Sequence, residues 1–245
     1  LGYRPERDRS PIVDPFEGFR SAVMIMAEDL GALRTDRSHW GPPSHVHLGD
    51  SRTLDLPPGS VDLAITSPPY VNGMDYVMNY KLDLAWLGYA RDYADLAELR
   101  HRMVACDNLP REEAARYARR KETPDPWLGT ILSQIERNLI EKGTYRRQDV
   151  HGVVNRYFWD LVPVLKMVHG ALRPGGRFSL VVGDSLLAGA YVPGDLLVAR
   201  LGARVGFEIE GITIARTRRS GQRRSFRLRE SIVTLRRPGP SSVAG

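Results

Sequence analysis

Residues 61–70 read VDLAITSPPY, an apolar run that stops abruptly at a serine, two prolines and a tyrosine. The run Val61–Ile65 is short and alternates poorly, which is typical of a strand buried on both faces within a parallel sheet. Because ligands of open α/β sheets bind beyond the carboxyl ends of the strands, we expect Ser67–Tyr70 to border a cleft. Pro68 and Pro69 make this turn stiff, since each has a fixed φ and no N–H. A hydroxyl, a free carbonyl and an aromatic ring on one rigid turn suit the binding of a planar amine.

The residues on both sides of the motif bear on its meaning. A Pro-Pro pair alone also marks ordinary loops, so a turn that simply ends a strand stays an open alternative. Upstream, Val46–Leu48 predicts another short strand, which ends near the acid Asp50. Downstream, Val71–Tyr76 reads VNGMDY. Together these flanking residues favour a binding site over a plain turn.

The sequence Ser67-Pro68-Pro69-Tyr70 resembles the catalytic motif of the amino-methyltransferases that modify exocyclic nitrogens of DNA bases. That motif is Ser/Asn/Asp-Pro-Pro-Tyr/Phe, and the form found here is similar to that of cytosine-N4 enzymes, although some adenine-N6 enzymes also carry it. The resemblance covers residues 46–237 in strand order. It implies an α/β fold with the Rossmann-like sheet of class I methyltransferases, mostly parallel with a C-terminal antiparallel hairpin. It also implies S-adenosyl-L-methionine as cofactor, DNA as partner, and a place in restriction and modification.

The resemblance also implies roles for the site residues. An exocyclic amine is a poor nucleophile because its lone pair is delocalised into the base. The Ser67 hydroxyl and the Pro68 carbonyl would accept hydrogen bonds from the amine, pull it toward tetrahedral geometry and free the lone pair, with Tyr70 stacked on the base. The amine then attacks the sulfonium methyl in line, with no metal and no covalent intermediate, on a base flipped out of the duplex.

Two residues are assigned to the cofactor on the same resemblance. Asp50 matches the acid that accepts a hydrogen bond from the adenine amino group of S-adenosyl-L-methionine, and Thr66 belongs to the same cofactor site. The alternative for Asp50 is that its side chain caps the turn that follows.

The cofactor loop of the family has one tempting match. Residues 14–18 read DPFEG, like the start of Asp-Pro-Phe-x-Gly-x-Gly, but the second glycine is missing. A helix start is favoured instead, with Asp14 as N-cap, Pro15 at the first helical position and Glu17 completing a capping box. The preceding apolar stretch, Pro11–Val13, is too short for a strand. We therefore expect the first strands and the glycine loop to lie upstream of this sequence or on a second polypeptide.

The rest of the chain predicts alternating helices and strands. Helices are expected over Met78–Ala90, Val150–Leu172 and Gly194–Gly206, and a buried strand over Arg177–Gly183. Pro163 would kink its helix or divide it in two. Gly175-Gly176 reads as a helix C-cap turn. Asp184 follows the strand and should face the same rim as Ser67. Leu82, Trp86 and Tyr89 are expected in the core.

Three regions are predicted: an N-terminal part of the catalytic domain with the motif (1–90), a helical insertion (91–150), and a C-terminal part with a basic hairpin (151–245). The insertion carries charged runs at Arg111–Glu113 and Arg119–Lys121, which we interpret as a solvated helix face. Related enzymes often carry an insertion here that reads the target sequence.

Residues 216–237 give the strongest compositional signal, nine arginines against one acid, Glu230. Ser220–Gln222 reads as a turn between the strands Ile209–Ala215 and Ser231–Leu235. Such a basic hairpin resembles an electrostatic footprint for phosphates. The alternative is an edge strand that charge protects against aggregation. The arginines assigned to nucleic acid are Arg216, Arg218, Arg219, Arg223, Arg224 and Arg227.

Composition agrees with a nucleic-acid partner. The formal charge is +6 and the pI about 9.6, which favours a polyanion. One cysteine, Cys106, excludes an internal disulfide framework and, with no secretory leader visible, predicts a cytoplasmic protein. No apolar run approaches the ~20 residues of a membrane span. Two other functions stay open: a non-catalytic nucleic-acid-binding half of a split enzyme, and an amine methyltransferase acting on RNA or protein.

Overall fold

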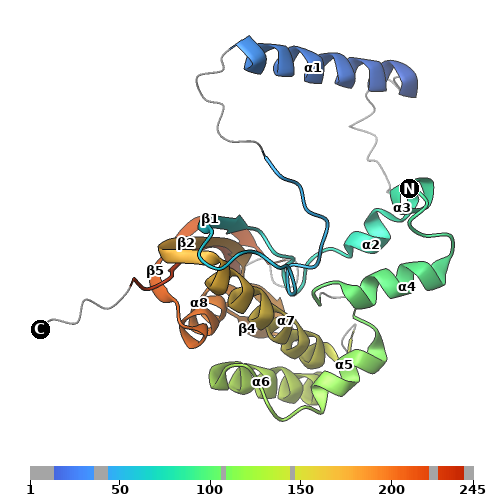
Figure 1. Cartoon of the computed structure of the whole chain (residues 1–245). Helices are drawn as coiled ribbons and strands as arrows, with labels where there is room; N and C mark the ends of the chain where they lie inside the picture. The colour runs from blue at the N-terminus through green and yellow to red at the C-terminus, as the bar shows by residue number, and fades with distance from the viewer. Residues whose placement is uncertain (1–13, 36–43, 106–108, 144–146, 221–225, 240–245) are drawn as a thin grey trace, which may run out of the picture. The chain divides into compact units, whose positions relative to one another are not determined.

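The computed structural model describes residues 14–35, 44–105, 109–143, 147–220 and 226–239. The chain divides into two units, Leu1–Leu48 and Gly49–Gly245. The first contributes the helix α1 (Pro15–Thr35), and the second holds all the other elements labelled in Figure 1. The predicted boundaries near residues 90 and 150 both fall inside the second unit.

Helix α1 begins as the capping signals predict. The backbone N–H groups of Phe16 and Glu17 donate to Asp14 Oδ1 at 2.8 Å and 3.2 Å. The side-chain oxygen of Asp14 therefore satisfies amides that the first helical turn leaves without partners. The stretch Asp14–Gly18 forms a helix start and not a cofactor loop.

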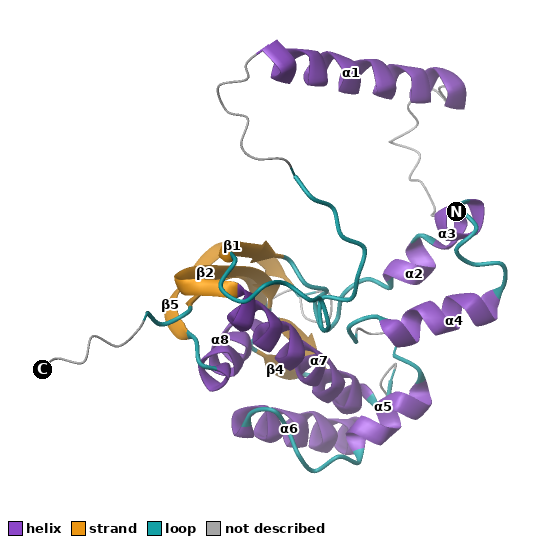
Figure 2. Ribbon diagram, viewed as in Figure 1, coloured by secondary structure: helices purple, strands orange, loops and turns teal. Residues whose placement is uncertain are grey.

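The second unit is built on a four-stranded mixed sheet in the order β1-β2-β6-β5. Figure 2 shows the strands in orange. Its strands are β1 (Val61–Thr66), β2 (Leu172–Gly183), β5 (Glu208–Arg219) and β6 (Arg227–Arg236). β1 pairs parallel with β2, whereas β6 pairs antiparallel with both β2 and β5. A separate two-stranded hairpin joins β3 (Ser185–Leu187) to β4 (Ala190–Val192). The α/β class and the C-terminal antiparallel hairpin are confirmed, whereas the expectation of a mostly parallel sheet is wrong for the described strands, because β6 pairs antiparallel with β2 as well as with β5.

The helices of this unit are α2 (Tyr76–Asn79), α3 (Lys81–Trp86), α4 (Tyr93–Arg102), α5 (Arg111–Ala118), α6 (Pro126–Lys142), α7 (Val150–Ala171) and α8 (Gly194–Val205). The predictions for α7 and α8 are confirmed. Pro163 lies inside α7 without dividing it. No helix in the part of the chain that the structure describes is long and apolar enough to cross a membrane.

The single helix predicted over Met78–Ala90 is wrong. Asp75 caps α2 by accepting from the Met78 amide, so helical structure begins earlier than expected, and Tyr80 separates α2 from α3. The chain then turns at Gly88, where φ is +76°. Because these short helices do not present one continuous face, the side chains predicted for the core, Leu82, Trp86 and Tyr89, are exposed.

The core lies between one face of the sheet and the helices α7 and α8, which pack on each other and on the strands (Figure 1). Phe178 and Leu180 of β2 and Leu235 of β6 are buried on this face. Phe158 of α7 meets them from the helical side, and each such side chain contributes about 1.5–3 kcal/mol through burial. Gly202 of α8 allows close approach, since a Cβ there would lie 2.5 Å from Leu235 Cδ1.

Strand β1 has one side uncovered, contrary to the prediction of a strand buried on both faces. Its side chains Leu63 and Ile65 are 52% and 71% exposed. β1 is also an edge strand of the sheet, because it pairs only with β2 among the described strands. Its apolar composition is typical of a central strand. The prediction was wrong because composition alone does not show which strands and helices lie beside β1.

The predicted turn at Gly175-Gly176 is also wrong, because β2 starts earlier, at Leu172. The Gly175 amide donates to the Arg237 carbonyl at 2.9 Å, and the Arg237 amide donates to the Gly176 carbonyl at 2.8 Å. Gly175 has a φ of +79° that disfavours other residues. Pairing with the chain beyond β6 overrides the local turn signal.

Candidate active site at the carboxyl end of β1

Thr66 ends β1, and the three residues that follow leave the sheet beside a cavity of about 290 Å³. Hydroxyl groups of Ser51, Thr66 and Ser67 border it, together with Pro68 and Pro69. The remaining wall is apolar and comes from β1, α7, β2 and Val104. The apolar lining residues are Ala64, Ile65, Val104, Leu161, Val164, Met167, Val168, Phe178 and Leu180. The motif therefore lies on the rim of a hollow with an apolar floor and a polar edge.

Tyr70 stands apart from that lining. Its ring lies against Gly183 at the end of β2, where a Cβ would come within 2.8 Å of Cε2. Burial raises the pKa of the Tyr70 hydroxyl, as do the charge of Glu230 and a hydrogen bond to it, while a hydrogen bond with Ser67 lowers it. The phenol is therefore neutral near pH 7 and anchored at its hydroxyl end.

The anchor of Tyr70 is itself held by an arginine. Arg216 Nε and Nη2 donate to the two carboxylate oxygens of Glu230 at 2.9 Å and 3.0 Å. This paired contact holds the pKa of Glu230 below its usual range. A second tie joins the loop after the motif to the start of β3, where Ser185 Oγ donates to Asn72 Oδ1 at 2.8 Å. The aromatic position of the motif is thus fixed from strands β2, β5 and β6.

Asp50 caps the turn that follows it, which was the alternative to its predicted role in cofactor binding. Its Oδ1 accepts from the backbone amide of Arg52 at 2.9 Å, and the Arg52 guanidinium binds both carboxylate oxygens. The hydrogen bond from the Arg52 side chain is the main reason that the pKa of Asp50 is lowered. The strand predicted just before it, Val46–Leu48, is wrong: these residues are an exposed loop with no ladder partner among the described residues.

A chain of ion pairs continues from Arg52 into the helices. Arg52 Nη1 lies 3.5 Å from Asp160 of α7, which binds Arg156 one turn earlier at 2.7 Å. Arg156 also binds Glu113 of α5 at 2.7 Å. The other oxygen of Asp160 accepts from the Ala105 amide. An arginine and an acid four residues apart on α7, Arg156 and Asp160, were the sequence signal for this network.

The polar residue at the end of β2, Asp184, is buried and bound by other side chains, although it was expected at the same rim as Ser67. Asp184 and Asp195 are both fully buried, and Arg229 bridges them at 3.1 Å and 3.0 Å. Tyr191 donates its hydroxyl to Asp184, and Ser231 Oγ donates to Asp195 at 2.8 Å. Burial and the neighbouring Asp184 raise the pKa of Tyr191. This cluster fastens β2, β4, α8 and β6 together.

The basic hairpin is less free than its composition indicates. Partners outside the hairpin or across it engage five of its arginines: Arg216 with Glu230, Arg218 with the Asp184 carbonyl, Arg229 with the two aspartates, Arg236 with Glu208, and Arg237 with the carbonyls of Gly170 and Leu172. The count of one acid within the segment is correct, but it left out the acids Asp184, Asp195 and Glu208 that other segments supply. Arg219 and Arg227, opposite each other on β5 and β6, have no ion pair among the described residues. Arg223, Arg224 and Cys106 lie outside the described residues.

No three His, Cys, Asp or Glu side chains gather as a metal site within the part of the chain that the structure describes. The groups that the chain offers at the carboxyl end of β1 are hydroxyl, carbonyl and aromatic groups on a rigid turn.

Comparison with known proteins finds relatives that match most of the chain. The chain is 27% identical over 224 residues to the Type II methyltransferase M.AvaI of Nostoc sp. strain PCC 7120, a match covering 86% of this chain and 45% of the relative. It is also 27% identical over 257 residues to the Type II methyltransferase M.BsoBI of Geobacillus stearothermophilus, covering 94% of this chain and 49% of the relative. Over most of its length, the chain is thus similar in sequence to proteins named Type II methyltransferases. It spans just under half the length of these curated relatives.

No protein-family model matches the sequence. Two crystal structures described as a DNA modification methylase of Thermus thermophilus share 19% and 18% identity with the chain, each with a TM-score of 0.37. Each match covers 79% of this chain, with 54% and 53% of the respective solved chain. The second of them contains S-adenosyl-L-methionine.

Proposed function

We propose that this chain is the catalytic part of a DNA amino-methyltransferase that transfers a methyl group to an exocyclic amine, cytosine N4 in preference to adenine N6. The observation that carries the proposal is the cavity bordered by Ser67, Pro68 and Pro69 at the carboxyl end of β1. The relatives named Type II methyltransferases support the reaction class. The serine at the first position of the motif supports cytosine N4.

The residues of this chain position the target amine. The exposed Ser67 hydroxyl and the Pro68 carbonyl accept its hydrogen bonds at the cavity rim. Tyr70 limits the position of the base with a ring that Gly183 supports from behind. Holding the reacting groups in line supplies up to about 7–11 kcal/mol of the barrier in ideal cases.

The proposed cofactor is S-adenosyl-L-methionine, which supplies an activated methyl group when bound. The described residues fit one side of it, with Thr66 in the cavity wall and Asp50 next in sequence to Ser51, which also lines the cavity. The Asp50 carboxylate is shared with Arg52, but its oxygens have lone pairs left for an amino group. No glycine-rich loop of the family type lies among the described residues.

The residues that would contact the other side of the cofactor are expected next to the free edge of β1. A strand added there would pair with the free backbone edge of β1, and a helix packed on the open face of the sheet would cover the exposed side chains Leu63 and Ile65. We infer that an upstream segment or a second polypeptide supplies this strand together with the glycine loop. Unpaired strand edges bind such additional strands readily.

DNA contact is proposed at the tip of the β5–β6 hairpin. Arg219 and Arg227 face each other across the two strands without ion pairs among the described residues, and Arg223 and Arg224 lie between them in sequence. Arg216 and Arg218 are tied to protein groups at one end, which makes them weaker candidates. Phosphate contacts by such arginines would partly offset the cost of base flipping.

Transfer of a radiolabelled methyl group to DNA tests the proposal. Ser67→Ala and Tyr70→Ala should each lower the transfer rate by about a hundredfold, because the amine loses its acceptor or its alignment. Ser60→Ala is the matched control, since Ser60 precedes β1 as Ser67 follows it and bonds only to the Pro57 carbonyl in its own turn. Equal rates in the wild type and both motif variants would reject the roles assigned here.

A second function is favoured by one observation, the absence of the glycine loop from the described residues. In that case the chain is a non-catalytic nucleic-acid-binding half of a split enzyme. The transfer assay separates the two: methyl transfer by the complete protein that Ser67→Ala leaves unchanged, together with salt-dependent DNA binding by this chain, supports the second function. Competition between DNA and RNA substrates in the transfer assay separates a DNA enzyme from an RNA enzyme.

A further inference from the structure

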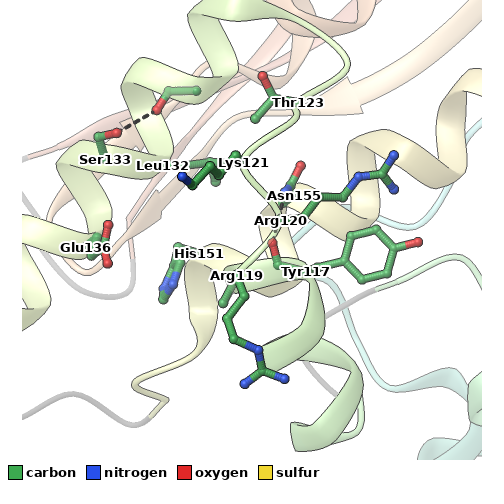
Figure 3. A pocket seen from close by; sticks show the side chains of 12 residues that line it. Tyr117, Arg119, Arg120, Lys121, Thr123, Leu132, Ser133, Glu136, His151 and Asn155 are labelled. Atoms are coloured by element: carbon green, nitrogen blue, oxygen red, sulfur yellow. Dashed lines mark hydrogen bonds between the residues drawn. The ribbon is translucent and has the colours of Figure 1, made fainter.

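A second cavity, of about 380 Å³, lies among the helices and shares no residue with the hollow at β1. It is bounded by the segment that follows α5, by α6 and by the first turns of α7 (Figure 3). Pockets of this volume are typical of small-ligand sites. The cavity thus has room for a ligand of its own.

The rim of this cavity is cationic. Arg119, Arg120 and Lys121 are consecutive, exposed and part of its lining, against the single acid Glu136. Arg119 and Lys121 have no ion pair among the residues that the structure describes. The interpretation of this run as a plain solvated helix face is therefore incomplete, because the charges gather at the mouth of a hollow.

Two aromatic rings lie next to Arg120 of this rim: Tyr117, which lines the cavity, and Trp159, which lies outside the lining. The Arg120 guanidinium lies over the Trp159 ring, 3.9 Å from its centroid, and 5.8 Å from that of Tyr117. Arg116 approaches Tyr117 at 5.3 Å from the last turn of α5. Basic groups interleaved with aromatic rings are the usual surface for unstacked nucleotides.

The floor carries a buried acceptor without a partner. Asn155 of α7 is 1% exposed, and its Nδ2 donates to the Tyr117 carbonyl at 3.0 Å. That bond fixes the orientation of the amide, since a flipped amide would set oxygen against oxygen. Asn155 Oδ1 has no hydrogen-bond partner among the described residues. Buried acceptors almost always have a donor, so a ligand or water donor is expected at this atom.

His151, one turn earlier on α7, presents a second unpartnered atom. Its Nδ1 is buried without a hydrogen bond among the described residues. Burial is the main cause of the lowered pKa of His151, which leaves the imidazole neutral at pH 7. A neutral imidazole can donate or accept at Nδ1, so the floor can match both kinds of group on a base edge.

The walls of the cavity are held rigidly. A Cβ on Gly152 would lie 1.9 Å from the Ala114 carbonyl oxygen, which shows how closely α5 approaches α7. The ion pair between Arg156 and Glu113 joins the same two helices at 2.7 Å. These contacts hold α5 against α7, and contact of a ligand with the buried Asn155 Oδ1 requires a local shift of the side chains at the floor.

We propose that this cavity is a nucleotide-binding site, separate from the motif at β1, that takes one nucleoside monophosphate unit. The base enters toward Asn155, with an exocyclic amine donating to Oδ1, and the phosphate stays at the rim with Arg119 and Lys121. The unit is either a free mononucleotide or an unstacked nucleotide of single-stranded DNA. The site depends on its own residues and not on methyl transfer at Ser67.

Binding of dAMP, dCMP, dTMP and a single-stranded oligonucleotide, followed by calorimetry at fixed salt, tests the proposal. The double variant Arg119→Ala/Lys121→Ala should weaken mononucleotide binding about tenfold or more. Lys166→Ala/Arg204→Ala is the matched control, since it removes the same charge from exposed positions of α7 and α8. The control should bind as the wild type does.

The base end is tested by Asn155→Ala, with a thermal melt to confirm folding. The wild type should prefer dAMP and dCMP, which carry exocyclic amines, over dTMP, and the variant should lose that preference. If Asn155→Ala does not fold, the preference of the wild type alone decides the same question.

Competition between a mononucleotide and the oligonucleotide also separates the two possible ligands, a free mononucleotide and a nucleotide of single-stranded DNA. Mononucleotide binding that the oligonucleotide displaces assigns the site to a DNA strand, and binding that it does not displace assigns a free nucleotide. Inorganic phosphate that binds as tightly as the nucleotides, or binding that is equal in the rim variant and the wild type, would overturn the proposal. Because the readout is binding, failure of methyl transfer leaves this result intact.

Discussion

Two neighbouring parallel strands, β1 and β2, end side by side in opposite ways. Each apolar run stops at a polar residue, Ser67 after β1 and Asp184 after β2. Ser67 is exposed on the rim of a cavity, whereas Asp184 is fully buried and receives Tyr191 and Arg229. A polar strand end with its own protein partners stabilises the fold, and one that faces an unfilled hollow is available to a ligand.

The largest effect is expected at the closed end. Arg229→Ala leaves the carboxylates of Asp184 and Asp195 buried without their cation, which should cost about 3–5 kcal/mol in the free energy of unfolding. Arg236→Ala is the control, because its partner Glu208 is exposed and surface pairs contribute at most about 1 kcal/mol. Urea unfolding followed by circular dichroism measures both. Similar losses in the two variants would remove the distinction between the strand ends.

The contact that joins the two ends should come next. Gly183→Ala places a Cβ within 2.8 Å of the Tyr70 ring, so overpacking should cost about 1–3 kcal/mol and displace the ring. Displacement by about 1 Å should also slow methyl transfer up to a hundredfold. Gly211→Ala on β5, where a Cβ meets nothing within 4 Å, serves as control. Full transfer activity in Gly183→Ala would show that Tyr70 does not depend on the end of β2.

A smaller, pH-dependent effect is expected at Glu230. Arg216 lowers the folded-state pKa of Glu230, so the stability that this carboxylate contributes is present above its unfolded pKa of about 4.3 and is lost as the pH falls through the folded value. Glu230→Gln should therefore be less stable than the wild type near pH 7, by less than about 1 kcal/mol, and the difference should shrink below pH 4. Melting curves from pH 3 to 8 measure it. A difference that stays constant to pH 3 would contradict the assignment.

The smallest effect is expected on the open side of β1. Ile65 is 71% exposed, so Ile65→Ser should change the free energy of unfolding by no more than about 0.5 kcal/mol. Leu180→Ala on the covered face of β2 should cost about 2–5 kcal/mol by comparison. A large loss in Ile65→Ser would show that another part of the protein already covers that face.

Local signals predicted those features that depend on a few adjacent residues. Asp14 caps α1, and the apolar spacing of residues 150–171 gives α7, because capping and helical periodicity act within a few turns. Local signals failed where pairing with a segment distant in sequence determines the secondary structure. Gly175 lies in a strand because Arg237 pairs with it, and Val46–Leu48 is a loop because no strand in the described part of the chain lies beside it.

In the candidate site, too, features set by adjacent residues were predicted and features set by distant residues were not. Residue identity placed Ser67 and the two prolines at a strand end, since a fixed φ and a missing N–H are properties of proline wherever it occurs. It did not show that Tyr70 leans on Gly183, or that Asp50 is held by Arg52. The polar cavity near Asn155 was also hidden, because its lining comes from three separate segments of the chain.

By itself, the sequence determined the α/β class, the rigid turn after β1 and the basic character of the C-terminal hairpin. Only the tertiary structure decided which polar groups are free. It paired Arg216 and Arg229 with carboxylates, left Arg219 and Arg227 without ion pairs among the described residues, and opened a cavity at Ser67 while closing Asp184. The physical reason is that a side chain's charge belongs to the residue, whereas its partners and its access to water depend on which distant segments fold against it.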